Sequence, residues 1–188
     1  EILPKRSRSS VDSALHGKHS ASWSLQPMPL SSELISFEAR IENLLDRADA
    51  AVLVDGELAS SLARFACVLT SGYLEESVRT LVGGWCGDKA HPHVHAYVGR
   101  QLDWFSNPKL GKLLELLSHF SATWRDEFEA VLTDEEKDAI NSVVSNRHQI
   151  AHGRNVGLSP VPMRRYLGAC KSAVRKLDLV VNPPHAVA

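Results

Sequence analysis

The chain has 188 residues, of which 44% are hydrophobic and 23% are charged, and this composition excludes a largely disordered chain. The length suits one domain with a single hydrophobic core. A formal net charge of −1 excludes attraction of nucleic acid or membrane through bulk charge, so any electrostatic signal must come from local clusters. No stretch approaches the roughly 18 consecutive apolar residues of a membrane span, and no membrane contact is predicted.

The two ends of the chain differ in composition from its middle. Residues 1–30 are rich in serine, basic and without hydrophobic periodicity, and they lack the apolar centre of a secretory signal. They are predicted to form a flexible leader or linker. Residues 183–188 open with two prolines and are predicted to be a tail. Residues 31–182 are expected to form the folded domain.

The first half of this domain has the apolar spacing of three helices. The first is predicted to begin at Ser31 or Ser32, either of which can cap it, and to end near Gly56. A second, long helix follows and is expected to be interrupted at Gly83–Gly84. The third is predicted to begin at Pro92, a residue suited to a first helical turn, and to break at Asn107–Pro108.

The second half continues the helical pattern. Apolar residues predict a helix over 110–120 and a short one around 124–128 that ends near Thr133. Thr133 then starts a capping box with Glu136, and this helix is expected to stop at Gly153. A last helix should run from 160–162 to the prolines at 183. No strand or repeat is indicated, so the predicted class is all-α, a single-domain bundle of six or seven helices.

Three cysteines, Cys67, Cys86 and Cys170, are odd in number and widely separated, without C-x-x-C spacing. This spacing predicts neither a disulfide framework nor a thiolate zinc site, and it favours a reducing cytoplasm. The alternating histidines of HPHVH, at 91–95, would be scattered by a helix that begins at Pro92. A histidine pair at 148 and 152 lacks a third ligand. We therefore predict no metal and no cofactor.

Residues 146–153 read N-R-H-Q-I-A-H-G and concentrate cationic and titratable groups before a predicted helix end. His148 and His152 are four apart and should share one helix face. Arg147 and His152 are five apart, which at about 100° per residue separates them by roughly 140°. They would line opposite walls of a groove, or a second copy of the helix would complete the site.

This pairing suits the cleavage of a phosphodiester. Histidine exchanges protons near neutral pH, whereas arginine stays cationic and offers planar donors to phosphate. His152 lies in the last helical turn, where the helix dipole favours the imidazolium. The alternative is that Arg147, His148 and His152 only cap exposed carbonyls at the end of the helix.

Local charge is uneven around this motif. Between Ala139 and Leu177 there are seven basic residues and no Asp or Glu, whereas the segment before Ala139 is acidic. Such a basic stretch attracts a phosphate backbone without reading its sequence, although it can also be a solvated face. The residues predicted to bind RNA are Arg154, Arg164, Arg165, Lys171 and Arg175.

The segment SNRHQIAHG resembles the Arg-x4-6-His signature of HEPN domains. The surrounding chain, over most of 33–182, is similar to the RiboL-PSP-HEPN subgroup, through FACVLTSGYLEESVRTLV, HPHVHAYV, the KLLELL segment and the closing helix. The resemblance implies a helical domain that acts as a metal-independent endoribonuclease. His152 would assist attack of the ribose 2′-hydroxyl on the adjacent phosphate, Arg147 would steady the charged intermediate, and a 2′,3′-cyclic phosphate would result.

The resemblance also implies partners and a setting. RNA would be the substrate, a homodimer would bring two motifs together, and an antitoxin or other regulatory protein could control the domain in a stress, toxin–antitoxin or antiphage system. The family commonly has Asn after the arginine, where this chain has His148. His148 could replace the amide or be a second proton carrier, and Asn146 could supply the amide.

Two other functions remain open at this point. The first is a noncatalytic helical module that binds RNA, a nucleotide or a protein through the same basic stretch. The second is a purely structural dimerisation domain, in which Arg147 and His152 would be buried apart from each other.

Overall fold

The computed structural model describes residues 30–183, so the predictions for 1–29 and 184–188 lie outside the described residues. Within 30–183 the chain forms seven α-helices and no strand, which confirms the all-α prediction. Their bounds are α1 Ser32–Ala51, α2 Gly56–Lys89, α3 Pro92–Asp103, α4 Leu110–Phe120, α5 Ala122–Val131, α6 Asp134–Ala151 and α7 Pro160–Val181.

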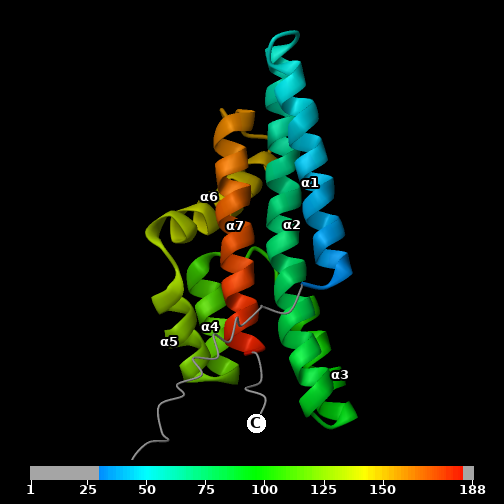
Figure 1. Cartoon of the computed structure of the whole chain (residues 1–188), viewed down its shortest axis with the longest axis vertical. Coiled ribbons are helices and arrows are strands. Elements are labelled where there is room, and N and C mark those ends of the chain that lie inside the picture. Colours follow the sequence, from blue (N-terminus) through cyan, green and yellow to red (C-terminus); the bar gives the residue numbers. More distant parts are fainter. Residues whose placement is uncertain (1–29, 184–188) are drawn as a thin grey trace, which may run out of the picture.

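Helices α1 and α2 form a long antiparallel hairpin whose turn projects beyond the rest of the bundle (Figure 1). Ser31 caps α1 by accepting a hydrogen bond from the Leu34 N–H at 3.3 Å. Asp55 caps α2 in the same way, by accepting from the N–H groups of Glu57 and Leu58. The predicted caps therefore set the start of α1, whereas α1 ends at Ala51, before the predicted Gly56.

The predicted interruption at Gly83–Gly84 is wrong, because α2 continues through both glycines to Lys89. Glycine in a helix interior costs about 1 kcal/mol relative to alanine. Tertiary contacts beyond the glycines oppose this cost. The Trp85 ring meets the Trp124 ring edge to face, with centroids 4.8 Å apart, and Cys86 is buried.

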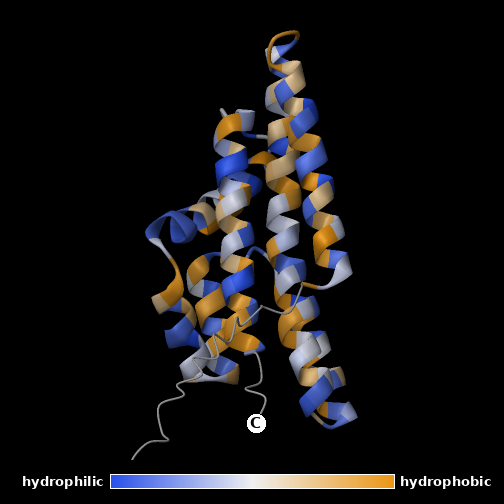
Figure 2. Ribbon diagram, viewed as in Figure 1, coloured by the Kyte–Doolittle hydropathy of each residue, from blue (hydrophilic) through white to orange (hydrophobic). Residues whose placement is uncertain are grey.

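The remaining helices begin where the sequence predicted them. Pro92 starts α3, which packs against the end of α2, and α4 covers 110–120 as expected. Thr133 and Glu136 form the predicted capping box at the start of α6: the Thr133 hydroxyl accepts from the Glu136 N–H, and the Glu136 carboxylate accepts from the Thr133 N–H at 2.7 Å. The start of α6, at the left edge of the molecule in Figure 2, is hydrophilic.

The hydrophobic core of residues 30–183 receives side chains from all seven helices. Its largest fully buried side chains include Tyr73, Phe128, Ile140, Met163 and Leu177, which come from four different helices. Cys67 and Cys170 are also buried free thiols, and burial raises the pKa of each to about 12. No helix of residues 30–183 is both long and apolar enough to cross a membrane.

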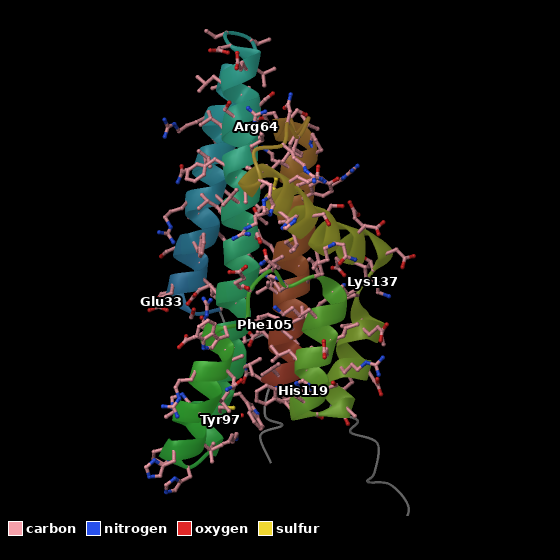
Figure 3. The ribbon with its side chains drawn as sticks, turned by 180° about the vertical axis from the view of Figure 1, so that it is seen from behind. Glu33, Arg64, Tyr97, Phe105, His119 and Lys137 are labelled. Atoms are coloured by element: carbon pink, nitrogen blue, oxygen red, sulfur yellow. The ribbon has the colours of Figure 1, made fainter. Side chains whose placement is uncertain are left out.

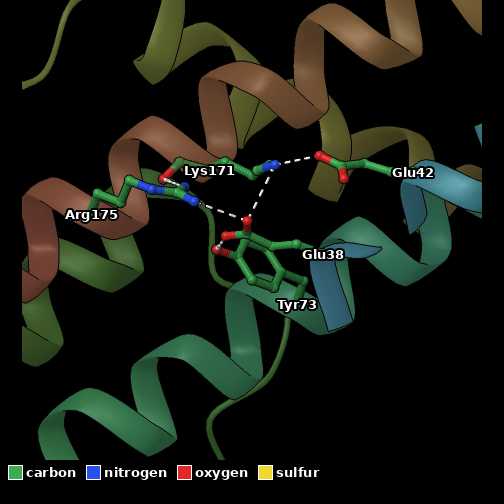
Figure 4. Close-up of polar contacts among 5 residues, drawn as sticks. All are labelled: Glu38, Glu42, Tyr73, Lys171 and Arg175. Carbon is green, nitrogen blue, oxygen red and sulfur yellow. Dashed lines mark hydrogen bonds and ion pairs between the residues drawn. The ribbon is translucent and has the colours of Figure 1, made fainter. Parts of the chain in front are cut away.

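A carboxylate from α1 holds three helices together (Figure 4). The Tyr73 hydroxyl of α2 donates to Glu38 Oε1 at 2.6 Å, and the Arg175 guanidinium of α7 donates to Oε2 at 2.9 Å. Lys171 Nζ lies 3.2 Å from Oε2 and also pairs with Glu42. Burial opposes ionisation of Glu38, but these donors outweigh it and lower the pKa of its carboxyl.

Candidate functional site

The motif segment occupies the last two turns of α6, and the geometry of its end is well defined. His152 is the C-cap residue, and its N–H donates to the carbonyls of His148 and Gln149, both at 3.2 Å. Gly153 follows with a φ of +68°, in the left-handed region that glycine adopts without steric cost. The helix therefore ends at the glycine that the sequence predicted.

His148 and His152 lie side by side at this end. Their ring centroids are 4.4 Å apart and the ring planes are 67° from parallel. Both residues are exposed, so the pair is open to a ligand from solvent. The predicted shared face of the two histidines is confirmed.

Arg147 lies on a different part of α6 and is half-buried, as is Asn146. In the part of the chain that the structure describes, no hydrogen bond or ion pair holds the Arg147 guanidinium, and none joins it to His148 or His152. The helix is tied to α2 one turn earlier, where Cys67 Sγ donates to the Val143 carbonyl at 3.5 Å. Within residues 30–183, therefore, no polar contact joins Arg147 to His152, which agrees with their predicted offset of roughly 140°.

The basic stretch predicted to bind RNA is largely neutralised by α1. Arg164 pairs with Asp46 at 2.6 Å and with Asp49 at 2.6 Å. Lys171 and Arg175 are held by Glu38 in the network already described. These acids stand more than a hundred positions away in the sequence, and α1 packs beside α7, so a count along one segment could not reveal them.

Of the five predicted RNA-binding residues, Arg154, Arg165 and Arg175 are exposed to solvent, and Arg175 is paired with Glu38. Arg165 makes one weak ion pair, with Glu135 at 3.9 Å. The Arg154 guanidinium is in no hydrogen bond or ion pair with the residues 30–183. Among these five residues, therefore, the unpaired positive charge next to the motif is that of Arg154 and not that of the middle of α7.

Arg154 lines a groove. One wall of this groove is the motif end of α6, and the other wall was not predicted from the sequence. The groove has a volume of about 530 Å³ and lies between the motif end of α6 and the segment that leads into α4. We call it the α4–α6 groove. Its lining residues are Asn107, Lys109, Lys112, Val144, Ser145, His148, Gln149 and Arg154.

The sequence predicts only a helix break at Asn107–Pro108, and no sequence pattern links this segment to the motif. In the structure, Asn107 has a φ of 52° and its N–H donates to Glu75 at 2.8 Å. The Leu110 N–H donates to Asn141 Oδ1 of α6 at 3.0 Å. These contacts fix the segment against α2 and α6 and so bring Lys109 and Lys112 to the groove.

A second hollow lies on the other side of the helix end. Arg64 of α2, which Figure 3 shows near one end of the molecule, donates to Asn155 Oδ1 at 3.5 Å. Arg64 lines this hollow with Gly153, Arg154 and Glu57. It is a further cation beside the motif that the sequence did not single out.

No group of three His, Cys, Asp or Glu side chains within residues 30–183 is placed to hold a metal ion. The HPHVH histidines stand at the start of α3, where His91 Nδ1 accepts a hydrogen bond from the His93 N–H at 3.4 Å. His91 thus acts as an N-cap, a role that explains a histidine at this position without a metal.

An all-helical bundle that carries an Arg-x4-His motif at the exposed end of a helix is of the HEPN class. The family model RiboL-PSP-HEPN matches residues 32–182, and the chain belongs to this family. The match covers all seven helices, from the first residue of α1 to the last residue of α7. No curated protein and no solved structure matches the chain.

Proposed function

We propose that the protein is a metal-independent endoribonuclease whose site is built on Arg147 and His152. The observation that supports this proposal most is the exposed end of α6, where the family motif presents His152 with a second imidazole, His148, 4.4 Å away between ring centroids. Two adjacent titratable groups near neutral pH suit proton removal and proton delivery in one reaction.

In the proposed reaction, His152 removes the proton from a ribose 2′-hydroxyl as its oxygen attacks the adjacent phosphorus. The bond from phosphorus to the 5′-oxygen of the next nucleotide breaks, and this oxygen takes a proton from an imidazolium, a role that we assign to His148. Arg147 stabilises the extra negative charge on the phosphate oxygens. The products are a 2′,3′-cyclic phosphate and a 5′-hydroxyl.

The offset between Arg147 and the histidine pair supports a homodimer. A partner subunit that packs along α6 would bring its own arginine toward His152, so each site would be shared. Large apolar side chains are exposed on the elements next to the motif, with Phe65 and Leu58 of α2 at 54% and 48% exposure and Val161 of α7 at 76%. Such surface is typical of a protein interface.

The family also supports the setting that we propose. A cytoplasmic ribonuclease that holds RNA through its phosphate backbone does not select a sequence. Such an enzyme would cut the RNA of its own host unless its activity is controlled. We therefore place the domain in a stress, toxin–antitoxin or antiphage system, with an antitoxin or other regulatory protein as its partner.

The purified chain is expected to cleave single-stranded RNA in the presence of EDTA and to leave DNA of the same sequence intact, because only RNA carries the attacking hydroxyl. Gel analysis of both labelled strands measures this. RNA that is bound in a salt-sensitive manner but never cut would contradict the enzyme and select the noncatalytic binding module.

A further inference from the structure

The α4–α6 groove continues directly from the histidine pair, because His148 belongs to both. Its volume of about 530 Å³ falls within the range of roughly 300–1,000 Å³ that small-ligand sites occupy. Its two walls are the motif face of α6 and the segment from Asn107 to Lys112. Anything that reaches the histidines along this side must pass over the groove.

Charge in the groove has one sign. Lys109, Lys112 and Arg154 line it, and no Asp or Glu does. Lys112 is held in place by a hydrogen bond to the Ser106 carbonyl at 2.6 Å and lies over the Phe105 ring, 5.2 Å from its centroid. Lys109 is exposed and forms no ion pair with any described residue. By contrast, three cations of α7, Arg164, Lys171 and Arg175, are paired with carboxylates of α1.

The beginning of α4 adds donors to the same wall. Lys109 is the N-cap residue and its side chain cannot accept a hydrogen bond. Asn141 Oδ1 accepts from the Leu110 N–H, but the N–H groups of Gly111 and Lys112 have no acceptor among the residues that the structure describes. Free N–H groups and the positive end of the dipole favour an anion at this point.

The sides of the groove suit the polar edge of a base, because Gln149 and Asn107 carry side-chain amides. Val144 closes the floor of the groove and is only 2% exposed. Asn107 Oδ1 is buried and accepts no hydrogen bond within residues 30–183. An unpaired buried acceptor is unfavourable, and a donor from a nearby ligand would relieve it after a small rotation of the amide.

From these observations we propose that the α4–α6 groove binds the nucleotide of the RNA strand next to the cleaved phosphate. Lys109, Lys112 and Arg154 hold its phosphates, and the base lies in the groove within reach of the Gln149 and Asn107 amides. The strand then crosses the start of α4 and not the α7 surface. This inference rests on the proposed function, because RNA is the substrate in both.

Binding is measured apart from cleavage by using the full chain with His152→Ala. A short fluorescent RNA is titrated by anisotropy over a range of salt concentrations. Lys109→Glu is expected to weaken binding about tenfold or more, since a hydrogen bond to a charged group contributes about 1.5–3 kcal/mol and about 1.4 kcal/mol is tenfold. The slope of log K against log salt should become shallower by about 0.7 for each lost contact.

Lys137→Glu is the matched control, because it makes the same charge change on α6 about 16 Å along the helix from His148. Circular dichroism checks that each variant keeps its helical content. If Lys109→Glu and Lys137→Glu weaken binding equally, the groove is not the RNA path. If AMP displaces the RNA as well as an unlabelled oligomer does, the groove is a free-nucleotide site and the inference is wrong. Cleavage by the protein with His152 intact still tests the proposed function separately.

Discussion

Replacement of His152 by alanine is expected to reduce RNA cleavage by about 10²–10⁴-fold, the usual contribution of a general acid or base. The fold should be unaffected, because the His152 side chain is exposed and only its backbone N–H takes part in ending α6. Single-turnover cleavage of a labelled RNA measures the loss, and a thermal melt checks the stability.

His119→Ala provides the control for this variant. His119 is also an exposed histidine in the last turn of a helix, but it belongs to α4 at the opposite end of the bundle from the motif (Figure 3). The His119→Ala protein should cleave RNA at the same rate as the normal protein. Equal rates for the normal protein and His152→Ala would show that the assigned chemistry is wrong.

Replacement of Glu38 by alanine is expected to lower the free energy of unfolding by about 2–3 kcal/mol. Removing one partner of a fully buried ion pair costs about 3–5 kcal/mol, whereas an exposed pair contributes at most about 1 kcal/mol. Glu38 itself is 6% exposed, but its partner Arg175 is 49% exposed, so the expected value lies between these limits. Tyr73 would also lose the acceptor of its buried hydroxyl.

Urea denaturation measures this loss, and Glu42→Ala is the comparison. Glu42 pairs with the same Lys171 but is 46% exposed, so its replacement should cost less than about 1 kcal/mol. A Glu38→Ala protein as stable as Glu42→Ala would mean that the buried network does not hold the three helices together.

The same network makes the free energy of unfolding depend on pH in the acidic range. Burial opposes the charge on Glu38, but its donors lower the pKa of its carboxyl below the ordinary value of 4.5. A carboxyl with a lowered folded pKa stabilises the fold above its unfolded pKa and loses this contribution as the pH falls toward the folded one. Stability should therefore decline below about pH 4.5, and less steeply in Glu38→Gln. Glu136, held by Lys176 and Ser172, adds to the decline.

Local signals predicted the helices well, because caps and breakers act within a few residues. Ser31, the Thr133–Glu136 capping box, Pro92 and Gly153 all mark the ends that the structure shows. The glycines at 83 and 84 misled the prediction, since the packing of Trp85 on Trp124 depends on a helix far away in the chain. Intrinsic propensity was outweighed there by tertiary contact.

The position of the histidine motif followed from the sequence, but its electrostatic surroundings did not. The α7 cations appeared free because Asp46, Asp49 and Glu38 belong to α1, and only the folded bundle brings them together. Lys109 and Lys112 were missed for the opposite reason. Their wall of the groove depends on a loop whose N–H groups donate hydrogen bonds to Glu75 and Asn141, which no periodicity shows.

The chemical identity of the cut ends tests the central claim most directly. Mass spectrometry of the fragments released in EDTA should find a 2′,3′-cyclic phosphate on one side and a 5′-hydroxyl on the other, and a single 2′-deoxy substitution should block cleavage at that position alone. Fragments with a 5′-phosphate and a free 3′-hydroxyl, or cutting that survives the 2′-deoxy substitution, would contradict attack by the ribose hydroxyl and with it the roles given to Arg147 and His152.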